Sequence, residues 1–125
     1  MNFYIASGFQ NKHLVQFVAS KLKVAGWQHT YDWTKNEKAT HAVQLQEIGQ
    51  AEKQAIRDAD VFLLLLDGGN GSHTEFGMAL AWEKKIYVYH ENNPLQTTFY
   101  HLPEVNMFQG KVEQFISYVV EKEGV

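Results

Sequence analysis

The chain has 125 residues, 45% of them hydrophobic, and a formal net charge of -3. One domain of this size buries enough apolar surface to fold without disulfides or a metal ion. The absence of cysteine excludes disulfide bonds, thiolate zinc sites and a cysteine nucleophile, and the acidic balance without a lysine- or arginine-rich block argues against nucleic acid or an anionic membrane as a partner.

The first half of the chain alternates strand-like and helix-like segments. Its expected elements are, in order, a strand over residues 3–6, a turn over 7–11, an amphipathic helix over 12–25, a strand over 27–33, a polar loop beside the expected crevice over 34–43 and a helix over 44–58. The first strand begins without the basic region and long apolar stretch of a signal peptide. Since no run is long enough to span a bilayer either, we expect a cytoplasmic protein.

The second half of the chain contains the most apolar strand. Residues 61–66 are all apolar and lack the alternation of a half-exposed strand, which indicates a central parallel strand covered on both faces. After it we expect a helix over residues 72–83, a strand over 86–89, a loop over 90–103, a strand over 105–108 and a helix over 111–121. Strands that alternate with helices throughout predict an α/β fold, a single doubly wound, flavodoxin- or Rossmann-like domain over residues 1–125 with a five-stranded parallel sheet flanked by helices.

The central strand leads into the loop Asp67-Gly68-Gly69-Asn70-Gly71, and a helix follows at once. In open α/β sheets, ligands bind beyond the carboxyl ends of the strands, and glycines there let the backbone come close to a ligand. The free N–H groups and the positive dipole end of the helix face the same crevice, with the carboxylate of Glu75 in the first turn. These features predict a ligand-binding site at this edge of the sheet.

Two stretches of the sequence form a recognisable pattern. The first is the opening strand, Phe3-Tyr4-Ile5-Ala6-Ser7-Gly8. The second is an aspartate before an apolar strand, a glycine-containing loop and a helix start, matched by Asp60, residues 68–71 and Thr74-Glu75-Phe76-Gly77-Met78-Ala79. Together they resemble the nucleoside 2-deoxyribosyltransferase family. The resemblance implies that the family's nucleophilic glutamate falls on Glu75, and that the strand tyrosine which helps to position it falls on Tyr4.

Two positions depart from the family pattern. Eight residues before the strand-opening aspartate, the family usually has an aspartate that contacts the base or assists proton transfer, and this chain has Glu52, whose reach is longer. Six residues before the nucleophile, the family often has an aspartate or serine that binds the sugar, and this chain has Gly69, with Asn70 beside it. The resemblance therefore implies a divergent member of the family.

Cleavage of an N-glycosidic bond needs stabilisation of positive charge at the anomeric carbon and help for the departing base. A carboxylate can attack that carbon to give a glycosyl-enzyme, while a second carboxyl protonates the base. The resemblance thus implies Glu75 as the nucleophile and Glu52 as the proton donor or base contact, with Asp67 as a weaker rival. The residues expected to bind the substrate are Ser7, Gly8, Phe9, Trp33, Asp67, Gly68, Gly69, Asn70, Gly71, Ser72 and His73, and Tyr31 is a further candidate to stack on the base. No cofactor is implied, and the six histidines show no metal-ligand spacing, so we expect no metal site.

Plainer explanations exist for the same residues. Ser72-x-x-Glu75 is by itself the pattern of a capping box, in which Ser72 caps the helix and Glu75 reaches back to the serine N–H. Glu52 lies among polar residues of a helix, where a solvated face with an ion pair is at least as common. Three other functions stay open: a non-catalytic nucleotide-binding or sensing module, an NAD glycohydrolase that uses the same glutamate, and a flavodoxin-like electron carrier, which the first loop disfavours because it lacks a run of hydroxyl residues.

The partners implied are a small-molecule nucleoside or nucleotide and further copies of the same chain, in a homodimer or higher homo-oligomer. The long loop over residues 90–103, with Asn92, Asn93, Phe99 and Tyr100, is the candidate to complete the site of a neighbouring subunit. The sequence leaves open the base, the sugar, the need for a 5′-phosphate and the acceptor.

Overall fold

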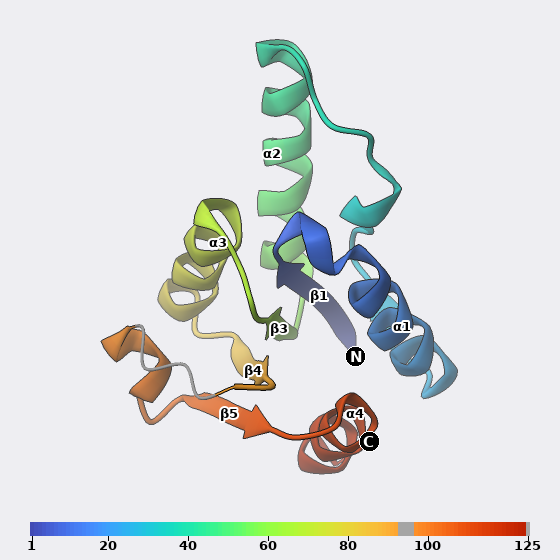
Figure 1. The fold of residues 1–125 in the computed structure, drawn as a ribbon, viewed down its shortest axis with the longest axis vertical. Coiled ribbons are helices and arrows are strands. Elements are labelled where there is room, and N and C mark those ends of the chain that lie inside the picture. The colour runs from blue at the N-terminus through green and yellow to red at the C-terminus, as the bar shows by residue number, and fades with distance from the viewer. Residues whose placement is uncertain (93–96, 125) are drawn as a thin grey trace.

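The fold is a five-stranded parallel sheet between two pairs of helices (Figure 1). It is seen in a computed structural model that describes residues 1–92 and 97–124. Within these residues the strands are β1 (Asn2–Ser7), β2 (Gln28–His29), β3 (Val61–Leu65), β4 (Lys85–His90) and β5 (Val105–Gln109). The helices are α1 (Lys12–Val24), α2 (Ala42–Asp58), α3 (Asn70–Ala81) and α4 (Val112–Lys122), with short 3₁₀ turns η1 (Phe9–Asn11), η2 (Trp33–Lys35) and η3 (Thr98–His101). The predicted α/β fold with a five-stranded parallel sheet is confirmed.

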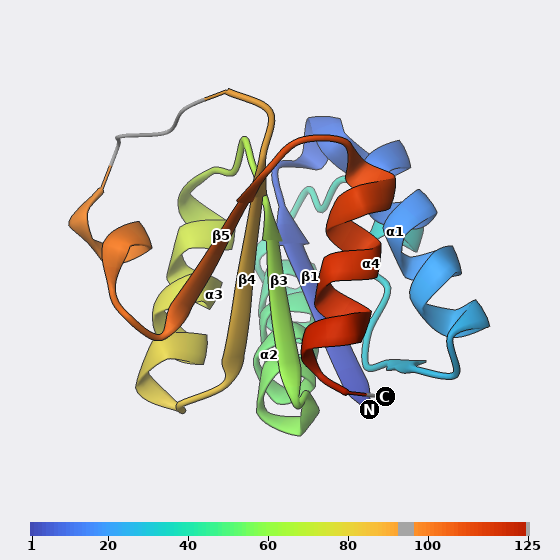
Figure 2. The ribbon, with the colours of Figure 1, turned by 90° about the horizontal axis from the view of Figure 1, so that it is seen from below.

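The strand order β2-β1-β3-β4-β5 changes its direction of growth between β1 and β3. Helices α1 and α4 cover one face of the sheet, and α2 and α3 cover the other (Figure 2). The connections that follow β1 and β3 therefore leave toward opposite faces, and a crevice opens between them at the carboxyl ends of the strands. The predicted site after β3 lies at this switch point.

Strand β3 lies at the centre of the sheet, and all five of its side chains are fully buried. It pairs in register with β1 on one side and β4 on the other, so that Leu65 lies beside Ser7 and Tyr89. Each fully buried leucine or phenylalanine side chain stabilises the fold by about 1.5–3 kcal/mol. The prediction of a central strand covered on both faces is confirmed, and the register fixes where the neighbouring strands end.

The predicted strand over residues 27–33 is wrong for most of its length, since β2 comprises only two residues at the edge of the sheet. The side chains of Trp27 and Trp33 are 3% and 7% exposed, so both are core contacts. Trp33 Nε1 donates a hydrogen bond to the backbone carbonyl of Ile5 at 2.7 Å. The side chain of Asp32 accepts a hydrogen bond from the backbone N–H two residues later, which turns the chain into η2. The aromatic residues that resemble a strand in the sequence thus pack from an irregular segment.

Two helices begin two residues earlier than predicted. Helix α2 begins at Ala42, with His41 as its N-cap, rather than at Gln44. Helix α3 begins at Asn70 rather than at Ser72. The loop predicted over residues 34–43 is therefore shorter, and the loop after β3 is reduced to a few residues next to the site.

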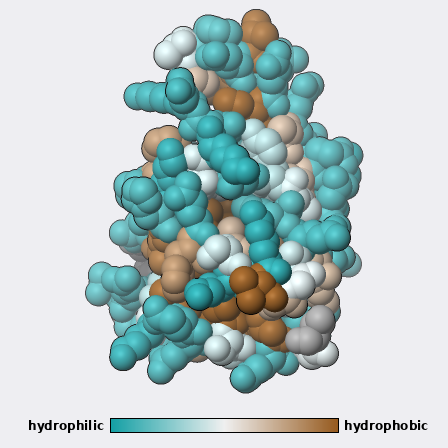
Figure 3. Space-filling view, turned by 90° about the vertical axis from the view of Figure 1, so that its right-hand side faces the viewer, coloured by the Kyte–Doolittle hydropathy of each residue, from teal (hydrophilic) through white to brown (hydrophobic). Residues whose placement is uncertain are grey.

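The half of α2 near its N-terminus extends beyond the sheet (Figure 1). Residues 42–50 are exposed apart from Ile48, and the side chains of Val43 and Leu45 are 60% and 59% exposed. Apolar atoms appear among hydrophilic ones at this end of the molecule (Figure 3). Of the helices in the described residues, none is long and apolar enough to cross a membrane.

The predicted loop over residues 90–103 contains η3, and the side chain of Tyr100 within it is fully buried. Its neighbour Phe99 is 57% exposed. Asn93, one of the residues expected to complete a neighbouring site, lies outside the described residues. The loop is therefore anchored to the core through Tyr100.

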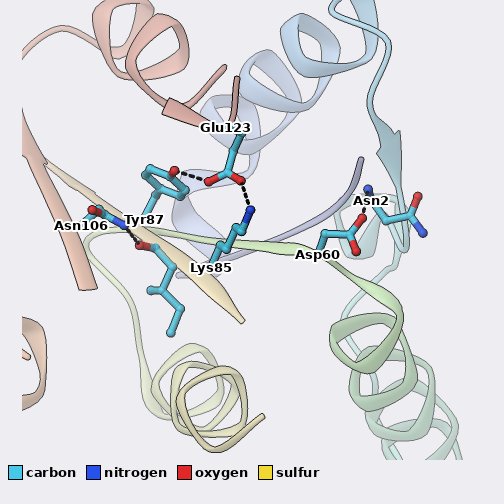
Figure 4. Close-up of polar contacts among 7 residues, drawn as sticks. Asn2, Asp60, Lys85, Tyr87, Asn106 and Glu123 are labelled. Atoms are coloured by element: carbon cyan, nitrogen blue, oxygen red, sulfur yellow. Dashed lines mark hydrogen bonds and ion pairs between the residues drawn. The ribbon is translucent and has the colours of Figure 1, made fainter. Parts of the chain in front are cut away.

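Polar contacts stabilise the other end of the sheet, at the amino ends of the strands (Figure 4). Lys85 Nζ lies 2.8 Å from Glu123 Oε1, and the same carboxylate accepts a hydrogen bond from the Tyr87 hydroxyl. The N–H of Asn2 donates to Asp60 Oδ2 at 2.8 Å. These contacts tie the end of α4 to β4 and the start of β1 to that of β3, far from the crevice.

Candidate active site

One buried hydroxyl group brings two carboxylates together between β1, α2 and α3. Tyr4 is fully buried on β1, and its Oη lies 2.8 Å from Glu75 Oε2 and 3.2 Å from Glu52 Oε2, in hydrogen-bonding geometry with both. Helices α2 and α3 pack on the same face of the sheet, so the two glutamates approach the hydroxyl from different helices. The structure thus brings together the three residues predicted to be catalytic.

Burial raises the pKa of both carboxyl groups. For Glu75, desolvation is the larger cause and the negative charge of Glu52 adds to it, which raises the pKa of Glu75 to about 8. Burial also holds the pKa of the Tyr4 hydroxyl well above its usual value. Two carboxyl groups in this position do not both ionise at neutral pH, so the pair shares one proton. The site therefore contains a carboxylate and a carboxylic acid at the same time.

The capping box does not account for Glu75. Gly69 is the N-cap of α3, and Ser72 Oγ accepts a hydrogen bond from the Gly69 N–H at 2.7 Å. Ser72 therefore lies inside the helix, and the Glu75 carboxylate is directed at Tyr4 instead of at the helix start. Glu52 is half-buried, and no ion pair involves it within the described residues. Both plainer explanations of the glutamates are wrong.

A pocket of about 170 Å³ opens onto the carboxylate pair. It is lined by Ser7, Phe9, Trp33, Glu52, Gly71, Ser72 and Glu75. The rings of Phe9 and Trp33 lie with their centroids 6.2 Å apart. Tyr31 is not part of this lining, and its hydroxyl accepts a hydrogen bond from Asn36 Nδ2 at 2.8 Å. Every residue of the lining was predicted from the sequence as a site residue.

A larger, mainly apolar pocket of about 490 Å³ shares Phe9, Trp33 and Glu52 with the first. Its other lining residues are Asn36, Glu37, Lys38, Ala39, Leu45 and Ile48. Sequence reasoning placed the loop beside the crevice and predicted the three shared residues, but it missed these six. The available signal was weak: Leu45 and Ile48 are apolar residues three positions apart, with glutamine and glutamate between them.

The loops after β1 and β3 are joined through the backbone carbonyl of Asp67. This carbonyl accepts hydrogen bonds from the Gly8 N–H and from Asn11 Nδ2, each at 3.0 Å. Ser7 Oγ donates to the carbonyl of Leu65 at 2.6 Å and accepts from Asn11 Nδ2 at 3.0 Å. Asn11 was not among the predicted residues, although asparagine in a turn commonly bonds to nearby backbone. It holds the two walls of the crevice together.

Several predicted binding residues lie outside the lining of both pockets, namely Gly8, Asp67, Gly68, Gly69, Asn70 and His73. A Cβ atom at Gly68 would collide with Ser72 Oγ, so glycine is needed there for a close approach. The His73 ring contacts the backbone carbonyl of Gly69 through Nδ1 at 2.9 Å and the Tyr100 hydroxyl through Nε2. In the part of the chain that the structure describes, no group of three or more histidine, aspartate or glutamate side chains is placed to hold a metal ion.

Comparisons with known proteins agree with this fold. A family model described as nucleoside 2-deoxyribosyltransferase matches residues 3–124. The solved structure of BcmB, a CMP N-glycosidase from Clostridium botulinum, has a TM-score of 0.69 and 19% sequence identity, and the match covers 95% of this chain and 98% of that chain. A conserved protein from Enterococcus faecalis V583 has a TM-score of 0.67 and 14% identity, with 94% and 98% covered. None of the curated proteins compared with the chain matches it.

Proposed function

The chain belongs to the nucleoside 2-deoxyribosyltransferase family, and from this premise we propose that it breaks the N-glycosidic bond of a nucleoside or nucleotide through Glu75 as the nucleophile. The glycosyl group passes to water or to a second base. The proposal is supported above all by the Tyr4 hydroxyl, which lies between the carboxylates of Glu75 and Glu52 at 2.8 Å and 3.2 Å. A helix cap or a solvated charge needs no such arrangement.

The shared hydroxyl lets the two glutamates exchange their proton. In the free site the proton resides on Glu75, because its pKa is raised to about 8. When Glu75 gives this proton to Tyr4 Oη and Tyr4 gives its own proton to Glu52, the tyrosine stays neutral throughout. The negative charge thereby moves from Glu52 to Glu75. Glu75 becomes the nucleophile and Glu52 the acid, and no proton leaves the site.

The reaction then proceeds in two steps. The Glu75 carboxylate attacks the anomeric carbon, the C–N bond breaks, and its electron pair leaves with the base, which takes the proton from Glu52. The glycosyl-enzyme ester is opened by water or by an N–H nitrogen of a second base, and the attacking group gives a proton back to Glu52 as its bond to the anomeric carbon forms. Either route restores one proton to the carboxyl pair.

The two pockets, which share three lining residues, suit the two parts of such a substrate. The base fits into the larger pocket, where it can stack on the rings of Phe9 and Trp33, and Glu52 lines both pockets. The glycosyl group faces the start of α3 at Gly71 and Ser72, where backbone N–H groups can receive a 5′-phosphate. Because the similar Clostridium botulinum protein is named a CMP N-glycosidase, CMP is the first substrate to test.

The test is base release from a panel of substrates, followed by chromatography. The panel contains CMP, other ribo- and deoxyribonucleoside 5′-monophosphates, free nucleosides and NAD, each with and without an acceptor base. We compare the wild type with Glu75→Gln, Glu52→Gln and the matched control Glu47→Gln, which changes an exposed carboxylate on α2. We expect release or exchange that disappears in Glu75→Gln, falls in Glu52→Gln and is kept in Glu47→Gln.

Other outcomes distinguish the alternatives. Nicotinamide release from NAD, with no turnover of the other compounds, would make the protein an NAD glycohydrolase. Calorimetric binding of a nucleotide by folded protein without turnover would make it a sensing module. Unchanged turnover in Glu75→Gln would remove Glu75 as the nucleophile.

Self-association is a second part of the proposal. Val43 and Leu45 on the extending half of α2 are exposed, and Leu45 also lines the larger pocket. A second copy of the chain packed on this helix would cover both side chains and narrow the pocket. We expect light scattering to give twice the mass of 14.4 kDa for the wild type and the single mass for Leu45→Glu. A monomeric wild type would contradict the proposed self-association and leave the proposed reaction untouched. The cytoplasmic location remains a prediction from the sequence.

A further inference from the structure

We propose that Tyr100 and His73 form a clamp that positions the glycine loop, residues 68–71, at the wall of the catalytic pocket. This inference rests on the proposed function. The Tyr100 hydroxyl on η3 contacts His73 Nε2, and His73 Nδ1 lies 2.9 Å from the backbone carbonyl of Gly69. The clamp therefore joins η3 to the start of α3 and to the loop after β3.

The two contacts determine which ring nitrogen of His73 carries the proton. A backbone carbonyl only accepts hydrogen bonds, so Nδ1 is protonated and donates to Gly69. In the neutral ring Nε2 is then an acceptor, and it accepts a hydrogen bond from the Tyr100 hydroxyl. Tyr100 remains protonated as this role requires, because burial, and to a lesser degree the charge of Asp67, raise its pKa. Both nitrogens of His73 are thus engaged by the protein.

The Gly69 carbonyl is the point at which the loop is held. Besides the contact with His73 Nδ1, this carbonyl accepts hydrogen bonds from the His73 backbone N–H at 3.1 Å and from the Ser72 hydroxyl at 3.0 Å. Gly71 and Ser72, which follow after Asn70, line the catalytic pocket. Since glycines have no side chains to restrain their backbone, the shape of the loop depends on contacts of this kind. The clamp pre-organises the wall that the glycosyl group faces.

The Tyr100 hydroxyl is not needed for packing. The Tyr100 ring packs against Phe76, with centroids 5.7 Å apart, and this contact is unchanged when the hydroxyl is removed. Tyr100→Phe therefore isolates the hydrogen bond to His73. His73→Asn keeps an amide nitrogen near the Nδ1 position, and His73→Gln places its amide near Nε2 and loses the donor to Gly69.

The protonation of His73 tests the clamp without any substrate. In ¹⁵N NMR spectra of the ligand-free protein at neutral pH, rings protonated at Nδ1 and at Nε2 give different correlation patterns, and His73→Asn identifies the signals of His73. We expect Nδ1 to carry the proton in the wild type, and a mixture of both forms in Tyr100→Phe. A wild-type His73 protonated at Nε2 would overturn the clamp, whatever the activity of the protein.

Hydrogen exchange and kinetics test the positioning role. We expect the peptide over residues 67–75 to exchange faster in His73→Gln and Tyr100→Phe, less so in His73→Asn, and as in the wild type in His101→Gln, an exposed histidine of the same η3 turn. With CMP, or with whichever substrate turns over, we expect KM to rise about ten-fold in His73→Gln, while kcat changes less. A ten-fold change is what the loss of one hydrogen bond produces. Exchange and KM of wild-type size in His73→Gln would refute the role. A wild type without turnover would end the proposed function, and the NMR and exchange results would still decide the clamp.

Discussion

Replacement of Glu75 by glutamine changes how the stability of the protein depends on pH. Burial, and then the charge of Glu52, raise the pKa of Glu75 from 4.5 to about 8 in the folded state. Between these two values the folded state holds a proton that the unfolded state releases, so the free energy of unfolding falls as pH rises. The stabilising contribution is complete below the unfolded-state pKa and is lost as pH passes through about 8. Glutamine has no charge to titrate, so the variant lacks this dependence.

The size of the effect follows from the pKa shift. At about 1.36 kcal/mol for each pKa unit, the rise from 4.5 to about 8 corresponds to about 5 kcal/mol. We therefore expect the free energy of unfolding of the wild type to fall by about 3–5 kcal/mol more than that of Glu75→Gln between about pH 5 and 9. This is a large share of the total stability of about 5–15 kcal/mol that is typical of a domain.

Urea unfolding followed by circular dichroism, repeated over this pH range, measures the difference. Groups that lie far from Glu75 titrate alike in both proteins and cancel when the two curves are subtracted. Glu47→Gln, which removes an exposed carboxylate from α2, is the matched control and follows the wild type. Parallel curves for the wild type and Glu75→Gln would refute the buried carboxyl pair as described.

Two further substitutions test the hydroxyl and the loop separately. Tyr4→Phe removes hydrogen bonds that lower the pKa of Glu75 and of Glu52, so the pKa of both carboxyl groups rises. Both limbs of the pH–rate profile of base release then move to higher pH, and kcat falls by about ten- to a hundred-fold; limbs that do not move count against the shared hydroxyl. Gly68→Ala places its Cβ against Ser72 Oγ and lowers the free energy of unfolding by about 1–3 kcal/mol. Position 69 has an extended backbone and open space around an added Cβ, so the matched Gly69→Ala lowers the free energy of unfolding by about 1 kcal/mol or less. Equal losses of unfolding free energy in the two alanine variants, measured with urea, would contradict the close approach of Gly68 to Ser72.

The fold could be predicted because its signal is local. Residues 61–66 by themselves predict a central strand, and the alternation of strands and helices predicts the architecture around it. The strand over residues 27–33 failed because burial of an aromatic ring has the same appearance in the sequence whether it comes from a strand or from a turn. Trp33 is buried and bonds to the carbonyl of Ile5, yet it begins a 3₁₀ turn. Such contacts depend on the packed structure, which local propensity does not describe.

The site was only partly predictable for the same reason. The pattern around Glu75 fitted a helix cap as well as a catalytic residue, and the cap is ruled out only in the folded structure, by the position of Ser72 inside α3 and by the contact between Glu75 and Tyr4. The contact between His73 and Tyr100 joins segments that are 27 residues apart and has no periodic or motif signal. Leu45 resembles an ordinary exposed residue until the neighbouring loop folds against it to form a pocket. Long-range contacts between irregular segments are what the sequence leaves undetermined.

The glutamate at position 52 connects the carboxyl pair to the larger pocket. Glu52 Oε2 lies 3.2 Å from the Tyr4 hydroxyl, and Glu52 belongs to α2, whose other half extends away from the sheet. An aspartate in this place would be shorter by one C–C bond, about 1.5 Å, and would lose the contact unless α2 moved inward. An inward shift of α2 would carry Leu45 and Ile48 into the space of the larger pocket. We infer that the longer side chain preserves the carboxyl pair while α2 stays far enough out to leave the larger pocket open.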